Sequence, residues 1–312
     1  MKRVVVFAHY DKDKIIDDYV LYYLKALKDV VDDIIFVSCQ NILNKEKIQN
    51  IVSNIIDEEH DEYDFGSYKR GYLYLKNNDL LKNYDELIFV NDSCYGPFHP
   101  LENIFSEMEN NRKCDFWGIT KNIFGIEKIK NKYLLTKRIH LQSYFLCFYK
   151  NVFLSDVFYN FIVSIKHENV KKDIIINYEI GLSELLIKNN FIFDSYNTNY
   201  IKFNNAIYYF WRQLIEKHNI PFVKCSILRL KNRNLTTTIN WQNVIKKHSD
   251  YPVEIIEKNL LRTTEKKEKL FNKIPFFSVN YYFFKSLVIK RIKLFFVFIN
   301  NKYAYFCKKY NL

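Results

Sequence analysis

LIFVNDSCYGPFHPL, residues 87–101, is the stretch that decides the fold of this chain. The apolar run Leu87–Val90 passes directly into the tripeptide Asn91-Asp92-Ser93, and a Gly-Pro turn follows. Buried apolar residues that end in short polar side chains are typical of a central parallel strand. Open α/β sheets bind ligands at the carboxyl ends of such strands, where Asp92 could hold a divalent cation or a ribose hydroxyl. The alternative is an ordinary Asx turn, because Asn, Asp and Ser all favour turns.

Strands and helices alternate on both sides of this stretch. Short apolar runs predict further strands at Arg3–Ala8, Ile34–Ser38 and Phe116–Thr120. Apolar residues at helical spacing predict helices over Asp17–Val31, Lys45–Ile56, Glu62–Asn77 and Leu101–Asn110. This alternation predicts an α/β domain with a mostly parallel central sheet.

The regular alternation ends near residue 120. One apolar strand is expected over His140–Tyr149. Helices are expected over Val152–Ile165, Asn177–Asn189, Tyr208–His218 and Asn240–Lys247.

The charge of the chain is unevenly distributed. The 312 residues carry a net charge of +12, and 48% of them are hydrophobic, which is enough for a large core. Residues 262–312 hold twelve Lys or Arg against two Glu, whereas the other 261 residues hold 35 basic and 33 acidic side chains. A nearly neutral body fits poorly with a nucleic-acid-binding domain, whose basic groups are expected on the folded surface.

The cysteines and the amino terminus indicate a reduced, cytoplasmic protein. None of the six Cys forms a CxxC pair or a zinc-like spacing with His. The first residues, MKRVVVFAHYDKDK, become charged too early for a signal peptide. No uninterrupted apolar stretch approaches the ~18 residues of a membrane-spanning helix.

Polar side chains are predicted to converge at one edge of the sheet. His9 and Asp11 follow the first strand, and Asp92 follows the strand at 87–90. DFGSYKRG, residues 64–71, opens the preceding helix and supplies Lys69 and Arg70. A carboxylate beside such cations suits a sugar nucleotide, because the cations face the diphosphate and the carboxylate holds a metal or hydroxyls. The alternative is an amphipathic helix with solvated Lys and Arg.

Five segments in one order resemble the rhamnan synthesis F family. They are DFGSYKRG, FVNDSCYGPFHPL, DFWGIT (115–120), HLQSYFLCF (140–148) and YEIGLSELL (178–186), within roughly residues 1–210. The resemblance implies a bacterial glycosyltransferase of cell-surface polysaccharide assembly, such as O-antigen, lipopolysaccharide or rhamnan. It would transfer a rhamnose- or galactofuranose-like sugar from a nucleotide donor to a lipid-linked glycan at the inner face of the cytoplasmic membrane.

The layout is also similar to the GT-A fold, in which a basic helix precedes a strand that ends in an Asp-X-Asp metal motif. This sequence supplies one of the two expected carboxylates, Asp92. Mg²⁺ or Mn²⁺ could still bind there if phosphate oxygens complete the ligand set. Alternatively, Lys69 and Arg70 neutralise the leaving diphosphate without a metal. The donor-binding residues implied are His9, Asp11, Asp64, Lys69, Arg70, Asn91, Asp92 and Ser93.

Glu179 is the candidate general base, because many inverting transferases of the GT-A type place a carboxylate late in the domain to deprotonate the acceptor. The alternative is a Glu that stabilises a helix start through the dipole. A retaining enzyme would need no such base. His140 is a second catalytic candidate, although it is more often a structural histidine. Candidate acceptor-binding residues are Trp117, Gln142 and Tyr144, each of which could equally be a core residue.

We divide the chain into a GT-A-like domain at 1–215, a helical extension at 216–262 and a basic, aromatic helical tail at 263–312. Residues 269–312 combine nine Lys or Arg with fourteen Phe or Tyr. Basic side chains can reach lipid headgroups while aromatic rings lie at the interface, so we expect a peripheral membrane protein. The alternatives are single-stranded nucleic acid or packing of the tail on the body. A non-catalytic scaffold recruited by this tail is the rival function.

Deleting residues 263–312 should abolish binding to anionic liposomes, since each Lys or Arg near such a bilayer contributes about 1 kcal/mol. Liposome co-sedimentation at low and high salt measures this loss. Binding of the full chain to RNA but not to liposomes would reverse the assignment.

Overall fold

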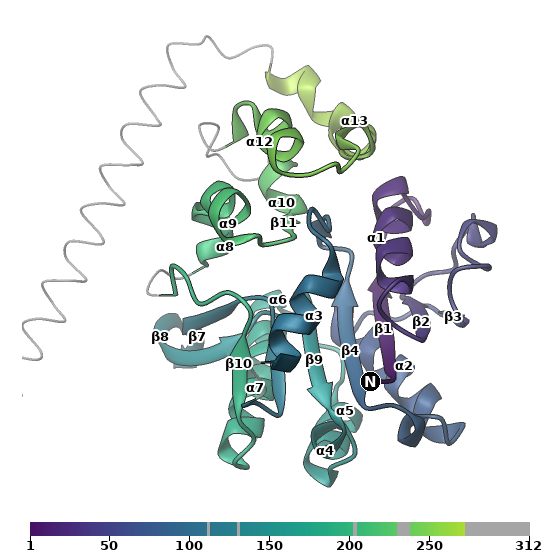
Figure 1. Cartoon of the computed structure of the whole chain (residues 1–312), viewed down its shortest axis with the longest axis vertical. Coiled ribbons are helices and arrows are strands. Elements are labelled where there is room, and N and C mark those ends of the chain that lie inside the picture. Colours follow the sequence, from purple (N-terminus) through teal and green to yellow (C-terminus); the bar gives the residue numbers. More distant parts are fainter. Residues whose placement is uncertain (111–112, 130–131, 202–204, 230–237, 272–312) are drawn as a thin grey trace, which may run out of the picture. The chain divides into compact units, whose positions relative to one another are not determined.

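The computed structural model describes residues 1–110, 113–129, 132–201, 205–229 and 238–271, with side chains described as far as residue 263. The chain divides into two compact units, Met1–Leu261 and Arg262–Leu312. The central sheet and the helices that cover it belong to the first unit (Figure 1). The basic tail predicted from the sequence lies outside the described residues beyond 271.

A seven-stranded sheet in the order β10-β6-β9-β4-β1-β2-β3 forms the centre of this unit. Strand β9 runs antiparallel to β4 and β6, and every other neighbouring pair is parallel. The predicted α/β class with a mostly parallel sheet is therefore confirmed. The strands are β1 (Arg3–His9), β2 (Asp33–Ser38), β3 (Asn54–Asp57), β4 (Glu86–Asn91), β6 (Phe116–Gly118), β9 (Phe145–Tyr149) and β10 (Phe193–Ser195).

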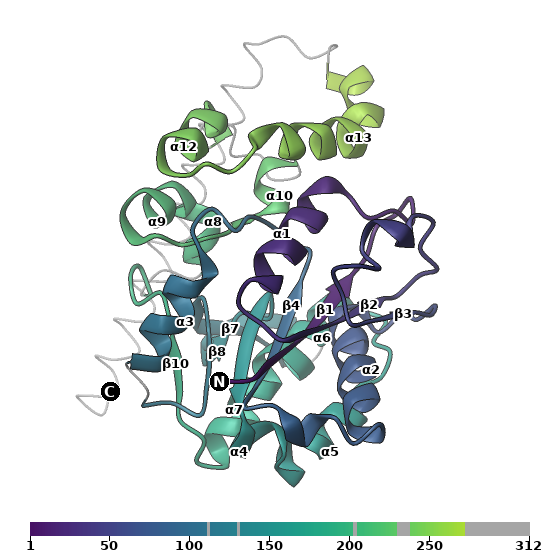
Figure 2. The ribbon, with the colours of Figure 1, turned by 45° about the vertical axis from the view of Figure 1, so that its right-hand side comes forward.

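Helices cover both faces of the sheet because side chains alternate along each strand. Val5 and Phe7 of β1 pack with helix α1 (Asp18–Lys28), whereas Val4 and Val6 pack with α2 (Tyr63–Asn77) on the other face (Figure 2). The first face also receives α3 (Leu101–Asn110) and α9 (Trp211–His218). The second receives α5 (Asp156–Ser164) and α7 (Gly181–Lys188).

Helix α2 approaches β1 very closely at Gly71. A Cβ atom at this position would overlap the Cγ atoms of Val6. Glycine is unfavourable in a helix by about 1 kcal/mol relative to Ala, so its presence here is explained by the close approach.

The order of the strands creates a switch point at β1. The chain runs outward from β1 through β2 to β3 and then returns to form β4 on the other side of β1. Ala8 of β1 pairs with Asn91 of β4, so the two strands end side by side. Ligands of open α/β sheets bind outside the carboxyl ends of the strands at such a point.

Two of the predicted elements are wrong, and the helices expected over Val152–Ile165 and Tyr208–His218 are each interrupted, at residues 154–155 and at residue 210. The helix expected over Lys45–Ile56 is a short 3-10 turn (Lys45–Lys47) followed by β3, because pairing with β2 outweighs the local helical pattern. The strand expected over His140–Tyr149 is interrupted at residues 142–144. Its first part ends β8 (Lys132–Leu141), which forms a separate hairpin with β7 (Lys121–Ile129), and its second part is β9.

The remaining elements are short or lie late in the chain. Strand β5 (Cys94–Tyr95) pairs with β11 (Val223–Lys224), two segments that are far apart in the sequence. A continuous helical stretch consists of α6 (Lys171–Ile174), a π-helix (Ile175–Ile180) and α7. The other helices are the 3-10 turn Leu81–Asn83, α4 (Lys150–Phe153), α8 (Ala206–Tyr209), α10 (Cys225–Leu228), α12 (Trp241–His248) and α13 (Val253–Phe271).

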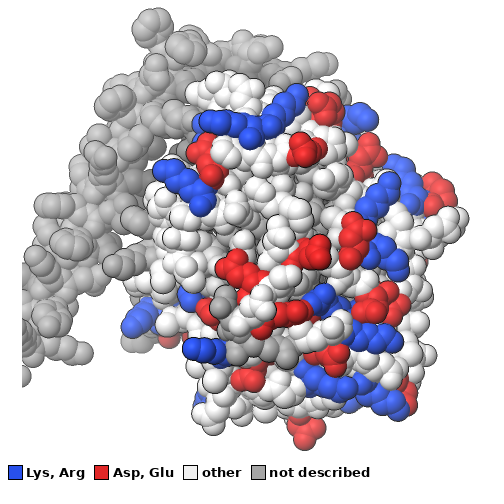
Figure 3. Space-filling model, in the orientation of Figure 1, with Lys and Arg blue, Asp and Glu red and all other residues white. Residues whose placement is uncertain are grey.

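The described surface carries both signs of charge. On the face drawn in Figure 3, Lys and Arg side chains are interspersed with Asp and Glu. In the described part of the chain, no helix combines the length and the apolar character needed to cross a bilayer.

Replacing Gly71 with Ala should destabilise the protein by about 1–3 kcal/mol, because overpacking against Val6 outweighs the gain in helix propensity. Urea unfolding of the variant measures this change. Asn77→Ala, at an exposed position of the same helix, is the control and should change stability by less than about 0.5 kcal/mol. A Gly71→Ala protein as stable as the control would contradict the close approach.

Candidate functional site

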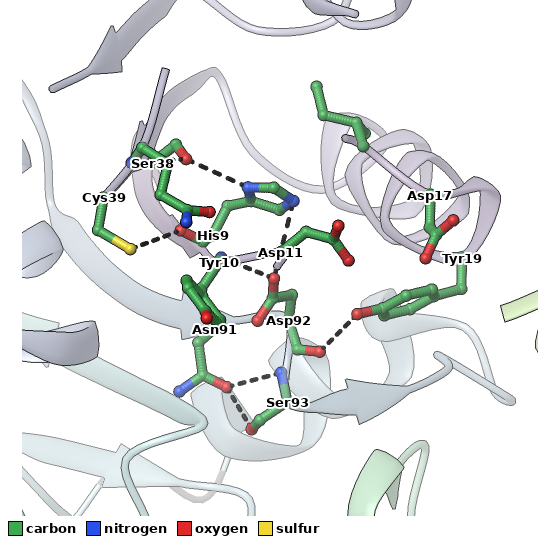
Figure 4. Close-up of polar contacts among 12 residues, drawn as sticks. His9, Tyr10, Asp11, Asp17, Tyr19, Ser38, Cys39, Asn91, Asp92 and Ser93 are labelled. Carbon is green, nitrogen blue, oxygen red and sulfur yellow. Dashed lines mark hydrogen bonds and ion pairs between the residues drawn. The ribbon is translucent and has the colours of Figure 1, made fainter. Parts of the chain in front are cut away.

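Asp92 and His9 meet where β4 and β1 end. The Asp92 side chain is 11% exposed, and its Oδ2 lies 3.8 Å from Nε2 of His9. The same oxygen accepts a hydrogen bond of 2.9 Å from the backbone N–H of Tyr10. On its other side, Nδ1 of His9 lies 3.3 Å from the hydroxyl of Ser38, the last residue of β2 (Figure 4). The predicted convergence of His9 and Asp92 is therefore present in the structure.

Burial raises the pKa of Asp92 to about 8, and the nearby carboxylates of Asp64 and Asp11 act in the same direction. The Tyr10 N–H and the Arg229 guanidinium oppose this rise in pKa. A carboxyl group with this pKa can keep its proton near neutral pH and donate a hydrogen bond to a ligand.

A second set of contacts joins α2 to the end of β4. The Asn91 side chain donates from Nδ2 to Oδ2 of Asp64 at 2.8 Å. Its Oδ1 accepts from the Ser93 backbone N–H at 3.1 Å and from the Ser93 hydroxyl at 2.5 Å. Both interpretations of the tripeptide at 91–93 thus apply, since it forms an Asx-type turn and also presents polar groups at the switch point.

Lys224 completes this set and was not predicted from the sequence. Its Nζ donates to the Ser93 hydroxyl at 2.9 Å and lies 4.3 Å above the ring of Tyr144. Pairing of β11 with β5 brings it there, with Lys224 opposite Cys94. The local sequence PFVKCS gives one weak signal, a single Lys between apolar residues.

Burial alone would lower the pKa of Lys224, but its neighbours raise it above the usual value. Those neighbours include the thiol of Cys94 and the carboxylates of Glu179 and Asp64. The same proximity acts on Asp64, whose pKa is raised by burial and by Glu179 and lowered by Lys224. Asp64, Glu179 and Lys224 therefore interact electrostatically within one site.

Glu179 lies in the π-helix Ile175–Ile180, and its carboxylate is held by the segment between β8 and β9. Its Oε2 accepts from the Ser143 backbone N–H at 2.9 Å and from the Ser143 hydroxyl at 2.5 Å. The helical stretch begins at Lys171, two turns earlier, so stabilisation of a helix start does not explain this Glu. π-Helical turns are frequent at functional sites.

His140 also faces Glu179. Its Nε2 lies 3.9 Å from Oε1 of Glu179, and its Nδ1 lies 2.8 Å from the backbone oxygen of Arg138. A carbonyl can only accept, so Nδ1 carries a hydrogen. The His140 side chain is 3% exposed, which suits a residue that orients Glu179.

The predicted acceptor-binding residues are in the core. Trp117 is fully buried and packs on Phe105 and Phe145, so its prediction as a platform for a sugar ring is wrong. The Thr120 hydroxyl contacts Oε1 of Gln142 at 2.6 Å and the hydroxyl of Tyr144 at 2.8 Å. Both side chains are buried, and Tyr144 instead supports Lys224.

Lys69 and Arg70, both on α2, already have partners away from this cluster. Nζ of Lys69 donates to the backbone oxygen of Ile165 at 2.6 Å, and Arg70 pairs with Glu58 and Glu62. The structure therefore places Lys224, rather than either of these two cations, against the Asp64–Asn91–Ser93 contacts. Asp11 accepts from the Asp13 backbone N–H at 2.8 Å, within a turn that follows β1.

The raised pKa of Asp92 predicts that this residue lowers the stability of the folded protein increasingly as pH rises. Between its unfolded value of about 3.9 and about 8, the native carboxyl keeps a proton that the unfolded chain has lost, so this group lowers the free energy of unfolding as pH rises through that window. Asp92→Asn should therefore gain stability relative to wild type by a few kcal/mol between pH 5 and pH 8. Urea unfolding at pH 5, 6.5 and 8 measures the difference.

Asp13→Asn, which alters a carboxylate whose side chain is 48% exposed, is the control for this pH series. A stability difference between wild type and Asp92→Asn that stays constant over the series would contradict the burial of a protonated carboxyl.

This chain is similar in sequence to known proteins. "Virulence protein VirA" of Vibrio anguillarum is 28% identical over 261 residues, which cover 73% of this chain and 80% of that protein. An uncharacterised protein of Sinorhizobium fredii, y4gN, is 28% identical over 153 residues, 48% of this chain and 37% of that protein.

Solved structures of similar fold include two enzymes. A 4-diphosphocytidyl-2C-methyl-D-erythritol synthase superposes with a TM-score of 0.41 and 10% identity, over 69% of this chain and 98% of that one. A putative glucose-1-phosphate thymidylyltransferase from Bacillus anthracis superposes with a TM-score of 0.38 and 12% identity, over 62% of this chain and 86% of that one. These similarities are too distant to bear on function.

The sequence model of one protein family matches residues 34–299, which is most of the chain. This span includes the ends of β2 and β4, the π-helix and Lys224. The chain belongs to the rhamnan synthesis protein F family.

Proposed function

We propose that this protein is a glycosyltransferase of polysaccharide synthesis that transfers a sugar from a nucleotide-sugar donor to a hydroxyl of a glycan acceptor. The observation that carries the proposal is the gathering of Asp92, Lys224 and Glu179 around the switch point of the sheet. Membership of the rhamnan synthesis protein F family supports the same reaction class.

The donor fits the edge formed by β1 and β4. His9 and Asp11 follow β1 on the side where a nucleoside would lie, and Asp92 offers a carboxyl to a hydroxyl of the ribose or the sugar. Lys224 supplies donors suited to the diphosphate, because hydrogen bonds from an ammonium to phosphate oxygens are strong. The N–H and the hydroxyl of Ser93 already donate to Asn91, and the Ser93 oxygen holds Lys224 in place.

Glu179 is suited to act on the acceptor. Its Oε2 is fixed by the two Ser143 hydrogen bonds, while Oε1 faces His140. In the proposed inverting reaction, Glu179 takes the proton of the acceptor hydroxyl and the acceptor oxygen bonds to the anomeric carbon. The bond from that carbon to the diphosphate breaks, and the nucleoside diphosphate leaves with the electron pair.

We propose that the sugar is rhamnose- or galactofuranose-like and that the acceptor is lipid-linked. The basic, aromatic residues 263–312 would hold the enzyme at the anionic inner face of the cytoplasmic membrane. The intermingled charges of the body fit this better than nucleic-acid binding, which favours a basic face. A non-catalytic scaffold with the same tail is the second candidate, and it predicts no nucleotide binding.

Glu179→Gln and Asp92→Ala should each lower the rate of sugar transfer by at least ~100-fold, because a positioned acid or base contributes roughly that much. The assay uses the full chain, nucleotide-activated rhamnose or galactofuranose and a lipid-linked glycan, with the product identified by mass spectrometry.

Glu168→Gln is the matched control. This Glu lies in the loop before α6 and accepts from Asn177 through Oε1, a bond that Gln can retain. Transfer should stay within about twofold of wild type in this variant. Near-normal turnover in both Glu179→Gln and Asp92→Ala would contradict the mechanism, and a wild-type protein that binds none of UDP, GDP and dTDP by calorimetry would favour the scaffold.

A further inference from the structure

Lys224 is a partly buried cation that forms no ion pair with a carboxylate of the described residues. Among the residues that the structure describes, its contacts are to groups other than carboxylates. Its ammonium donates to the hydroxyl of Ser93, lies near the thiol of Cys94 and has the face of the Tyr144 ring beneath it. No carboxylate oxygen of the described residues lies within ion-pairing distance of Nζ. Removing an ammonium group from water is costly without a counter-charge, so this position is suited to an anionic ligand.

The other cations considered for the diphosphate differ in this respect. Arg70 pairs with Glu58 and Glu62, and Lys69 donates to the Ile165 backbone and lies 3.9 Å from Glu62. Their charges are already balanced by protein groups. Lys224 has two further ammonium hydrogens besides the one given to Ser93, and these can be donated to phosphate oxygens.

The polar groups beside Lys224 do not fit a divalent metal ion. The GT-A pattern expects two carboxylates in this tripeptide, but Asp92 is the one that the sequence supplies, beside Asn91 and Ser93. The Asn91 oxygen accepts from Ser93, and the Ser93 hydroxyl accepts from Lys224. Within the described part of the chain, no group of three or more His, Cys, Asp or Glu is arranged to hold a metal.

A divalent cation at Ser93 would also repel the ammonium group. Nζ of Lys224 lies 2.9 Å from the Ser93 oxygen, so an ion bound to that oxygen would lie within a few ångströms of a like charge. Mg²⁺ and Mn²⁺ require several oxygen ligands, and Asp92 is the one carboxylate of the tripeptide.

We propose that the ammonium group of Lys224, in place of a divalent metal ion, binds the diphosphate of the donor and neutralises the leaving nucleoside diphosphate. This proposal rests on the glycosyltransferase function proposed above. As the bond between the anomeric carbon and the diphosphate breaks, the electron pair passes to the phosphate oxygen, and the negative charge develops beside an ammonium that is already in place.

The surroundings keep Lys224 protonated and oriented. The nearby carboxylates of Asp64 and Glu179 favour the charged ammonium without bonding to it directly, and the Tyr144 ring supports it from below. Tyr144 is itself fixed by its contact with the Thr120 hydroxyl. The cation is therefore positioned before the ligand binds, which lowers the cost of binding.

The test is calorimetric binding of UDP, GDP and dTDP to the full chain in EDTA, and again in excess Mg²⁺ or Mn²⁺. We expect one of the three to bind wild type with the same affinity, within about threefold, in all buffers. Lys224→Met and Lys224→Gln should each weaken that binding at least tenfold with or without metal. Lys224→Arg should stay within about tenfold of wild type, because it retains the charge.

Lys121→Met is the matched control. This partly buried Lys lies on β7 of the separate hairpin and pairs with Asp194 of β10. It should bind the nucleotide as wild type does. Gln is one atom shorter than Lys but keeps a neutral N–H donor, so Lys224→Gln tests the charge even if Lys224→Met fails to fold, with thermal unfolding as the check.

The outcomes separate this proposal from the function on which it rests. Binding that appears only with Mg²⁺ or Mn²⁺, and that survives in Lys224→Gln, would overturn the role of Lys224 and leave the glycosyltransferase standing. If wild type binds no nucleoside diphosphate in any buffer, the proposed function fails and the role of Lys224 fails with it. Metal-independent binding that is lost in Lys224→Gln supports both.

Discussion

The parallel pairing of β1 with β4 is the constraint on which the site depends. Its register places Ala8 opposite Asn91, so that the next residues, His9 at the end of β1 and Asp92 directly after β4, lie together at the edge of the sheet. The connections that leave β1 and β4 run in opposite directions along the sheet. In the described part of the chain, no crossover helix therefore covers the end that the two strands share. The apolar runs that fill both strands are therefore the cause of the polar cluster, since burial of the runs fixes where their polar ends must lie.

Local patterns were sufficient for the elements that build this edge. The predicted ranges agree closely with the strands β1, β2 and β4 and the helices α1, α2 and α3. In each of these elements the buried residues recur at regular spacing along the sequence, which makes the element recognisable. Lys224 could not be found in this way. Its position depends on a two-residue pairing between β11 and β5, segments separated by about 130 residues, and nothing in PFVKCS encodes that partner. Edge strand β3 was likewise determined by its neighbour β2 rather than by its own pattern.

Lys69 and Arg70 show the limit of reasoning from spacing. Their position on the helix before β4 was predicted correctly, but spacing along α2 does not reveal which face meets the site and which meets the acidic loop at 58–62. Among the charged residues of the same helix, Asp64 is the one that reaches β4, through Asn91. Glu179 illustrates the opposite case. The sequence nominated this residue but put it at the start of a helix, whereas the π-helix that directs it and the Ser143 bonds that fix it required the fold.

The balance of charge in this cluster bears on how it could receive an anion. Asp92, Asp64 and Glu179 would together present three negative charges against Lys224, and a diphosphate would add more. Burial changes this balance, because it raises the pKa of Asp92 to about 8 and so favours the neutral form of that carboxyl near neutral pH. A neutral Asp92 repels no phosphate and can donate a hydrogen bond to it or to a sugar hydroxyl. Arg229, whose charge lowers the pKa of Asp92, limits the effect without removing it. Burial at the switch point thus does more than hold the strands, since it suppresses the charge of Asp92 and so reduces the repulsion that an anionic ligand meets beside Lys224.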